Sequence, residues 1–198
     1  MREYNGGLTR EQFLFYEIRI VATLVSQGYT KAEAIEKIKE ENLFQFPTER
    51  MTASIANTCF QRLSALESDA LVYHLANATA DVAKQINLYA MMKHNAIVWD
   101  FMTTVVGEKF RTQEFEFSKK DLNVFMFQLR EQNDAVASWS EGTIAKIKQV
   151  LTKCLVECEF LDSVRATMLN PVSIAPELED EIRLNNDAAA LAAFNCFR

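Results

Sequence analysis

Between Gly142 and Val156 the chain carries three lysines and no acidic residue, although its 198 residues have a formal net charge of −6. The polar side chains of this segment are Thr143, Lys146, Lys148, Gln149, Thr152 and Lys153. Ammonium groups attract phosphate oxygens, whereas a carboxylate in the same place repels them. The segment therefore indicates a helix face that contacts phosphate, with an ordinary solvated face as the alternative.

A second acid-free segment, residues 50–66, has the side-chain types that hydrogen-bond to base edges and phosphates. Its candidate contact residues are Arg50, Ser54, Asn57, Gln61 and Arg62. The first four recur at spacings of four, three and four, which places them on one face of a helix. A solvated helix face is again the alternative. The acidic balance of the whole chain counts against nucleic acid, so the interpretation depends on where the charges lie.

Two cysteines, Cys154 and Cys158, lie one helical turn apart, as two ligands of a metal ion would. A complete site needs further ligands, and the histidines His74 and His94 have no paired spacing with either thiol. Buried cysteines that act as small apolar side chains are the better interpretation. No metal and no cofactor are expected.

One further group could support catalysis, because Glu114, Glu116 and Lys119 are spaced as in a magnesium-dependent nuclease. The alternation with Phe115 and Phe117 instead favours a strand edge with solvated glutamates. The sequence has neither a Gly-x-Ser-x-Gly motif nor a glycine-rich phosphate loop. We therefore do not expect an enzyme.

The composition predicts a mainly α-helical bundle, because 49% of the residues are hydrophobic and only five glycines and three prolines occur. The apolar spacing predicts helices over residues 10–26, from 30 to about 40, 48–66, 81–95, 96–110, 118–133, from Ser138 or Ser140 to 157, and 177–194. Capping boxes are predicted at Thr9, Thr30 and Ser118. Trp139 is expected to be a buried anchor of the lysine-bearing helix.

A short helix followed by a turn and a longer helix is predicted twice. After the second pair, residues 159–163 and 168–175 could form a small hairpin, which gives the order of a winged helix-turn-helix. We expect a helix-turn-helix-like N-terminal region over residues 1–78. A C-terminal region with the winged-helix-like element is expected over residues 79–198, and both regions are expected to form one compact unit.

The location expected from the sequence is the cytoplasm. The first residues carry charge where a signal peptide needs an apolar stretch. The most apolar windows are much shorter than the ~20 residues of a membrane-spanning helix. The sequence therefore predicts a soluble protein without a membrane partner.

Several longer segments resemble a known family. The stretches YNGGLTREQFLFYE, EENLFQF, QRLSAL, QINLYAMMKHNAIVWDFM and REQNDAVASWSEGTIAKIKQVLTKCLVECEFL resemble, in the same order, the BrxA family of bacteriophage exclusion (BREX) systems. The resemblance covers about Tyr4 to Leu161, and its most specific blocks are INLYA and Trp-Ser-x-x-Thr. It implies a small, mostly helical, non-enzymatic protein, comparable with the NusB antitermination fold, that binds double-stranded DNA. It does not identify the DNA-contacting side chains.

The combined expectation is a DNA-binding component of a phage-defence system, with other BREX proteins as further partners. Two alternatives stay open. In the first, the acidic surface serves as an assembly adaptor for partner proteins, and nucleic acid is incidental. In the second, the protein binds RNA, by analogy with NusB-like folds.

Overall fold

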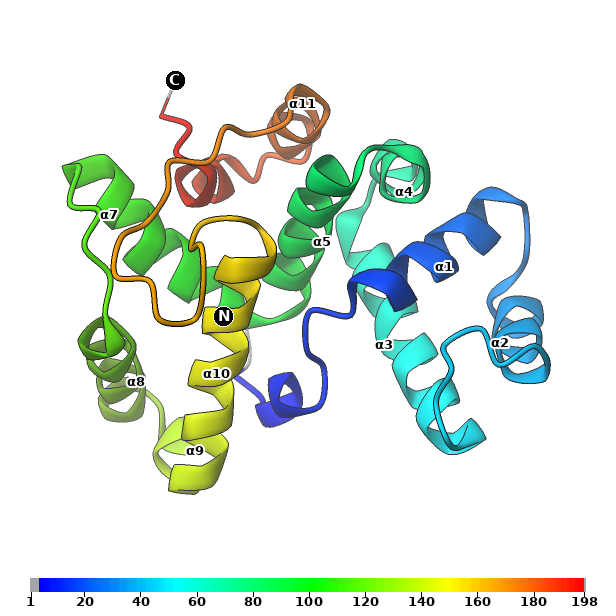
Figure 1. The fold of residues 1–198 in the computed structure, drawn as a ribbon, viewed down its shortest axis with the longest axis horizontal. Helices are drawn as coiled ribbons and strands as arrows, with labels where there is room; N and C mark the ends of the chain where they lie inside the picture. The colour runs from blue at the N-terminus through cyan, green and yellow to red at the C-terminus, as the bar shows by residue number, and fades with distance from the viewer. Residues whose placement is uncertain (1–3, 198) are drawn as a thin grey trace. The chain divides into compact units, whose positions relative to one another are not determined.

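The computed structural model describes residues 4–197 and is mainly helical, as expected (Figure 1). The chain divides into two compact units. The central unit runs from Leu14 to His94, and the terminal unit joins the residues up to Phe13 with those from Asn95 onward. The predicted boundary between residues 78 and 79 falls inside the central unit, and the division into two folding regions at that point stays a prediction.

The central unit is a packed set of helices. They are α1 (Phe15–Ser26), α2 (Lys31–Glu40), α3 (Glu49–Leu66), α4 (Asp69–Asn77) and α5 (Ala80–His94). α1 and α5 each pack against α3 and α4, and α2 packs against α3. Apolar residues at helical spacing, such as Ile55, Cys59 and Leu63 of α3, are buried in these contacts.

The helix starts show which capping predictions were correct. Thr30 forms the expected capping box with Glu33 at the start of α2. The predicted box at Thr9 is wrong, because the Thr9 hydroxyl donates to the carbonyl of Gly6 within a 3-10 helix, η1 (Gly6–Thr9). α1 begins only at Phe15, five residues after the predicted start at residue 10.

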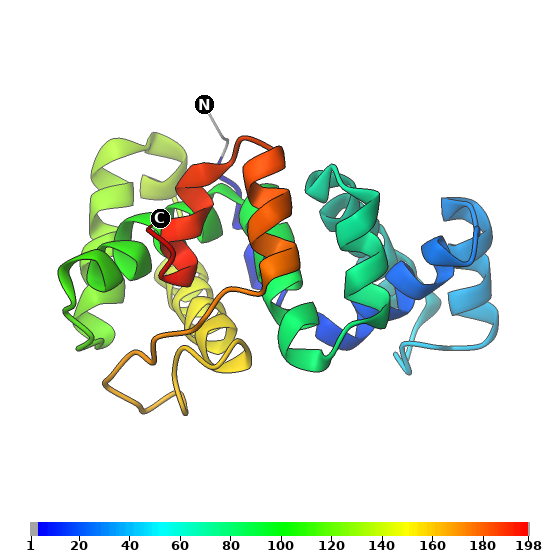
Figure 2. The same cartoon turned by 90° about the horizontal axis from the view of Figure 1, so that it is seen from above.

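The terminal unit contains the remaining elements. They are α6 (Ala96–Asp100), the π-helix η2 (Phe101–Val106), α7 (Gly107–Thr112), α8 (Lys119–Gln132), α9 (Asp134–Ala137), α10 (Glu141–Glu157), α11 (Pro176–Leu184) and the 3-10 helix η3 (Ala188–Phe194). Figure 2 shows α11 and η3 side by side. Gly107 lets α7 approach η3 closely, because a Cβ there would lie 3.0 Å from the Cβ of Ala192.

Phenylalanines form much of the core of the terminal unit. The Phe101 ring lies edge-on to Phe125 and Phe117, with centroids 5.4 and 6.2 Å apart. Phe160, which follows α10, packs against Phe110 of α7 at 6.0 Å. The Phe160 contact connects the end of α10 with α7, and the contact of Phe101 with Phe125 connects η2 with α8.

Residues 159–175 do not form the expected hairpin of two strands, although the Asn170 N–H donates to the carbonyl of Phe160 over 2.8 Å. Met168 instead makes an isolated antiparallel bridge with Glu116. The Leu169 N–H donates to the carbonyl of Phe115 over 2.7 Å, and the Phe117 N–H donates to the carbonyl of Thr167 over 2.9 Å. The alternating pattern around Phe115 and Phe117 therefore marked an extended segment, but its partner lies about fifty residues away in the sequence. The structure therefore lacks the hairpin on which the winged-helix-like interpretation of residues 159–175 was based.

Across the residues that the structure describes, no helix is long and apolar enough to cross a membrane.

Candidate nucleic-acid interface

Of the two starts that the sequence allowed, Ser138 and Ser140, the structure uses Ser140 as the N-cap of α10. The Ser140 hydroxyl accepts the N–H of Thr143 over 3.1 Å and lies 3.0 Å from the Thr143 hydroxyl. The buried side chains of the helix are Ile144, Ile147, Val150, Leu151, Cys154 and Leu155. Their burial leaves the opposite face, which carries Gln149 and Lys153, exposed.

The neighbouring helix α8 is fixed at its first turn. Ser118 and Asp121 form the expected capping box, and the Lys109 ammonium lies 2.9 Å from the Asp121 carboxylate. Partial burial opposes the ionisation of Asp121, but the hydrogen bonds from Lys109 and Ser118 outweigh it and lower the pKa of this carboxyl. This turn carries Lys119.

Two side-chain contacts connect α8 with α10. Near the N-terminus of α10, the Arg130 guanidinium is 2.8 Å from the carboxylate of Glu141. Further along, the Lys148 ammonium donates to the amide oxygen of Asn123 over 2.9 Å. The second contact differs from an ion pair, because the amide is neutral and leaves the positive charge of Lys148 uncompensated.

The N-terminal segment approaches α10 from its other side. The 3-10 helix η1 packs against α10, and the Tyr4 hydroxyl donates a hydrogen bond to the carboxylate of Asp100. Burial, with the hydrogen bond and the negative charge of Asp100, raises the pKa of Tyr4 to about 12, so the donor stays protonated at neutral pH. These contacts hold the segment that brings Gln12 alongside α10.

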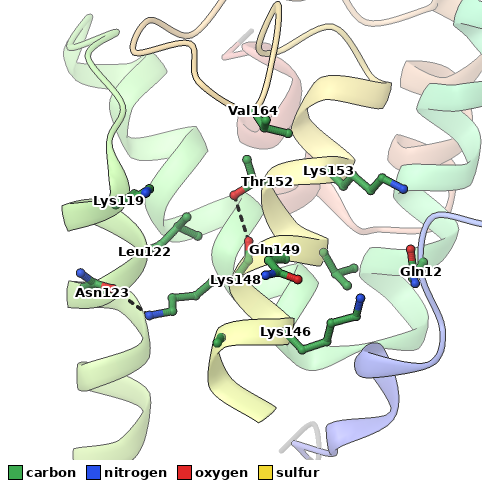
Figure 3. Close-up of a pocket in the computed structure, with 12 residues that line it drawn as sticks. Gln12, Lys119, Leu122, Asn123, Lys146, Lys148, Gln149, Thr152, Lys153 and Val164 are labelled. Carbon is green, nitrogen blue, oxygen red and sulfur yellow. Dashed lines mark hydrogen bonds between the residues drawn. The ribbon is translucent and has the colours of Figure 1, made fainter. Parts of the chain in front are cut away.

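Together these elements form a groove of about 680 Å³, which we call the α10 groove. It is lined by Gln12, Lys119, Leu122, Asn123, Ala145, Lys146, Lys148, Gln149, Val150, Thr152, Lys153 and Val164. In Figure 3, Lys148 reaches from α10 toward α8, whereas Lys146 and Lys153 extend on the side of Gln12. α10 therefore forms the floor of the groove and presents cations toward both of its walls.

The charge of the α10 groove is uniform in sign. Its lining contains four lysines, and none of the described residues that line it is a carboxylate. None of the four forms an ion pair with a carboxylate among residues 4–197. Other cations of the chain are ion-paired, among them Lys37, Arg111 and Arg183. An acidic protein thus keeps a cluster of uncompensated positive charge in one place, which attracts anions.

Five of the six polar residues named for the segment 142–156 line this groove: Lys146, Lys148, Gln149, Thr152 and Lys153. Thr143, the sixth, is half-buried in the first turn of α10, where its hydroxyl lies 3.0 Å from that of Ser140, and it does not line the groove. Its role in the described structure is to begin the helix. Lys119, on the facing helix α8, also lines the groove. From the sequence it was considered only as part of a possible metal site with Glu114 and Glu116.

The predicted contact face on α3, in the central unit, is less complete. Arg50, Ser54 and Gln61 are exposed, but Asn57 donates its amide to the carbonyl of Ala53 over 2.9 Å. Arg62 is only 1% exposed, so its guanidinium lies inside the central unit and is not available to a ligand at the surface. The α3 face therefore keeps one exposed cation, Arg50.

Seven lining residues were not predicted to belong to the interface, namely Gln12, Lys119, Leu122, Asn123, Ala145, Val150 and Val164. Lys119 and Asn123 are four residues apart on a predicted helix, which places them on one face. Nothing in the sequence indicated that this face adjoins α10. Gln12 and Val164 lie outside regular helices, where periodicity gives no signal.

The candidates for metal chemistry do not assemble into a site. Cys154 and Cys158 are both buried, as expected. Within the described part of the chain, no group of three or more His, Cys, Asp or Glu side chains is placed to hold a metal ion. Glu114 and Glu116 are exposed, and Lys119 lines the α10 groove.

Comparison with known proteins places these features in a family. The family model described as BrxA matches residues 2–186. A protein of Bacillus cereus named BREX protein BrxA is 33% identical over 158 residues, which cover 80% of this chain and 78% of that protein. Proteins with the same name from Paramagnetospirillum magneticum and Escherichia coli are 25% and 26% identical, over 86% and 90% of this chain and 85% and 83% of their own lengths. The chain belongs to the BrxA family of BREX phage-defence systems.

The fold also has a counterpart among solved structures. A crystal structure of an uncharacterized protein from Magnetospirillum magneticum superimposes with a TM-score of 0.82. The alignment covers 98% of each chain at 22% sequence identity. At this identity the match concerns the fold alone.

Proposed function

We propose that this protein is a non-enzymatic, DNA-binding component of its BREX system, and that the α10 groove contacts the phosphates of double-stranded DNA. The observation that carries the proposal is the set of four lysines that line the groove without an ion pair to any described carboxylate. In a chain of net charge −6, such a cluster has a clear electrostatic use only toward an anion. DNA presents a regular array of phosphates to these lysines.

The groove determines what kind of DNA binding is expected. Lysine acts on phosphate as a point charge and reads no base sequence. About four phosphate contacts release few counterions, so the affinity should be roughly micromolar near physiological salt. The protein therefore binds duplexes of any sequence with similar strength, and its acidic remainder keeps it from spreading over the DNA surface.

An assembly adaptor is a second candidate function, and one observation favours it. Val124 and Phe127, three residues apart on α8, are 45% and 63% exposed. Large apolar side chains that share an exposed helix face are typical of contacts between proteins. This face and the α10 groove involve different side chains of α8, so the two functions are separable by mutation.

Fluorescence anisotropy with labelled duplex DNA, single-stranded DNA and duplex RNA tests the proposal over a range of salt concentrations. We expect duplex DNA to bind most tightly, with a slope of log K against log [salt] of about −4, from 0.9 per contacted phosphate. A slope steeper than about −6 requires more contacts than this groove supplies and contradicts the assignment. Absence of duplex binding at low salt supports the adaptor, and preference for RNA supports an RNA-binding protein.

A further inference from the structure

The α10 groove is more hollow than phosphate contact requires. Lysines on a convex surface contact phosphates without any cavity, as an extended side chain reaches its target alone. The volume of about 680 Å³ lies within the range of ~300–1,000 Å³ that is typical of small-molecule sites. The hollow is therefore large enough for a ligand that enters it.

The hollow also contains apolar surface among its cations. Leu122 of α8 and Val150 of α10 line it with their side chains largely buried. Val164, in the loop that follows α10, lines it as well and is 62% exposed (Figure 3). Contact with phosphate does not explain an exposed valine beside lysines, because a phosphate leaves its apolar surface in water. A flat aromatic face covers such a surface favourably.

The polar groups of the hollow fit the same kind of ligand. Gln149 is exposed on the floor, and its amide can both donate to and accept from the edge of a base. Lys119 and Lys148 lie on the α8 side of the groove, where they can hold a phosphate. Since no described lining residue is a carboxylate, a cationic ligand finds no partner there.

From these observations we propose that the α10 groove contains a subsite for one unpaired nucleotide. Its base covers the exposed side chain of Val164, and its phosphate lies on the lysines. Paired bases within a duplex are stacked and do not offer their faces, so the nucleotide is either the end of an overhanging strand or a free nucleotide. The strand-end form rests on the proposed function, because the same lysines then hold the adjoining duplex.

A set of matched probes tests the subsite. Binding is measured by anisotropy for a blunt duplex, for the same duplex with a one-nucleotide overhang, and for the duplex with an abasic overhang that carries the same phosphate charge. We expect the base-bearing overhang to bind about five-fold more tightly than the abasic one, because a base contact adds to phosphate contact. Equal binding of these two probes overturns the subsite and leaves the proposed function intact.

Adenosine monophosphate, added as a competitor and titrated alone by calorimetry, distinguishes the two sources. Removal of the overhang preference by the free nucleotide assigns the subsite to nucleotides in general. Persistence of the preference at millimolar nucleotide assigns it to strand ends. Binding of the free nucleotide without any duplex binding contradicts the proposed function and retains the subsite, whereas no binding of any probe contradicts both.

Two exposed valines, Val164 and Val124, provide a test variant and its matched control. Val164→Ser removes apolar surface from the hollow without changing charge, and it should remove most of the five-fold preference while the blunt duplex binds as before. Val124→Ser makes the same change on an exposed part of α8 that lies outside the groove, and it should leave all three probes unaffected. A preference that survives in the Val164 variant with its fold intact contradicts the placement of the base.

Discussion

The α10 groove and the α3 face began from the same sequence signature and differ in what the fold makes of it. Both are acid-free helix segments that carry cations, amides and hydroxyls. α10 keeps its three lysines at the groove and gains Lys119 from α8. α3 buries Arg62 and leaves Arg50 as its exposed cation. A local surplus of positive charge in the sequence thus becomes a site only where neighbouring elements add to it.

The largest expected effect is a loss of stability when the buried arginine of α3 is truncated. Arg62→Ala should lower the free energy of unfolding by about 3 kcal/mol, because truncation of a large, fully buried side chain leaves a cavity. Chemical denaturation measures the change, and Arg50→Ala, on the exposed end of the same helix, should stay within about 0.5 kcal/mol. A stable Arg62→Ala protein that no longer binds DNA would show that this arginine contacts the ligand.

The next effect concerns affinity. Lys146→Glu combined with Lys153→Glu should weaken binding of every duplex by about 30-fold at low salt, because two attractions become repulsions. Lys153 is exposed and Lys146 is half-buried at the groove, and neither belongs to the buried side of α10, so the fold should be retained. Arg50→Glu provides the comparison on α3 and should change duplex affinity less than about two-fold. A larger loss of duplex affinity for Arg50→Glu than for the double lysine variant would place the DNA interface on α3.

Truncation of Trp139 should destabilise the fold less than the size of its side chain suggests. The sequence predicted a buried anchor, but the residue is only half-buried in the turn before α10. Trp139→Ala should therefore lower the free energy of unfolding by about 1–2 kcal/mol, below the range of ~3–5 kcal/mol for a fully buried aromatic. Duplex affinity should not change. Thermal unfolding and anisotropy on the same sample test both parts, and a loss of binding alone would make Trp139 a surface contact.

The smallest effect is a pH dependence at the first turn of α8. The folded pKa of Asp121 lies below its ordinary value of 3.8, so its contribution to stability is present above that value and is lost as the pH falls through the folded pKa. Asp121→Asn should therefore reduce the stability at pH 7 and flatten its decline between pH 5 and pH 2. Denaturation curves over this range test the assignment, and an unchanged slope would show that Asp121 is not coupled to folding.

Helix type and many starts were predictable, because they depend on local patterns. The capping boxes at Thr30 and Ser118 were recognisable from a few adjacent residues, and the start of α10 was narrowed to Ser138 or Ser140, of which Ser140 is the N-cap. The same reasoning failed at Thr9, where the spacing was right but the hydroxyl donates within a 3-10 turn. A short motif does not reveal which of two local hydrogen bonds will form.

Contacts between distant segments were not predictable. The partner of the extended residues around Glu116 is Met168, which periodicity places in a hairpin with its own neighbours. The groove likewise needs α8 beside α10, and the contacts that join these helices, Lys148 with Asn123 and Arg130 with Glu141, link residues 25 and 11 positions apart. The burial of Arg62 also follows from packing, since its spacing on α3 only indicated a polar position.

Two adjacent lysines of α8 allow the most direct test of the central claim. Lys119 lines the α10 groove, whereas Lys120 lies on another side of the helix, around a second hollow that includes Glu108 and Asp121. Lys119→Glu and Lys120→Glu make the same charge change one residue apart, in the same helical turn. Duplex affinity at low salt should fall about five-fold or more for Lys119→Glu and remain within two-fold for Lys120→Glu. Equal losses for both variants would mean that net charge, and not the α10 groove, governs DNA binding.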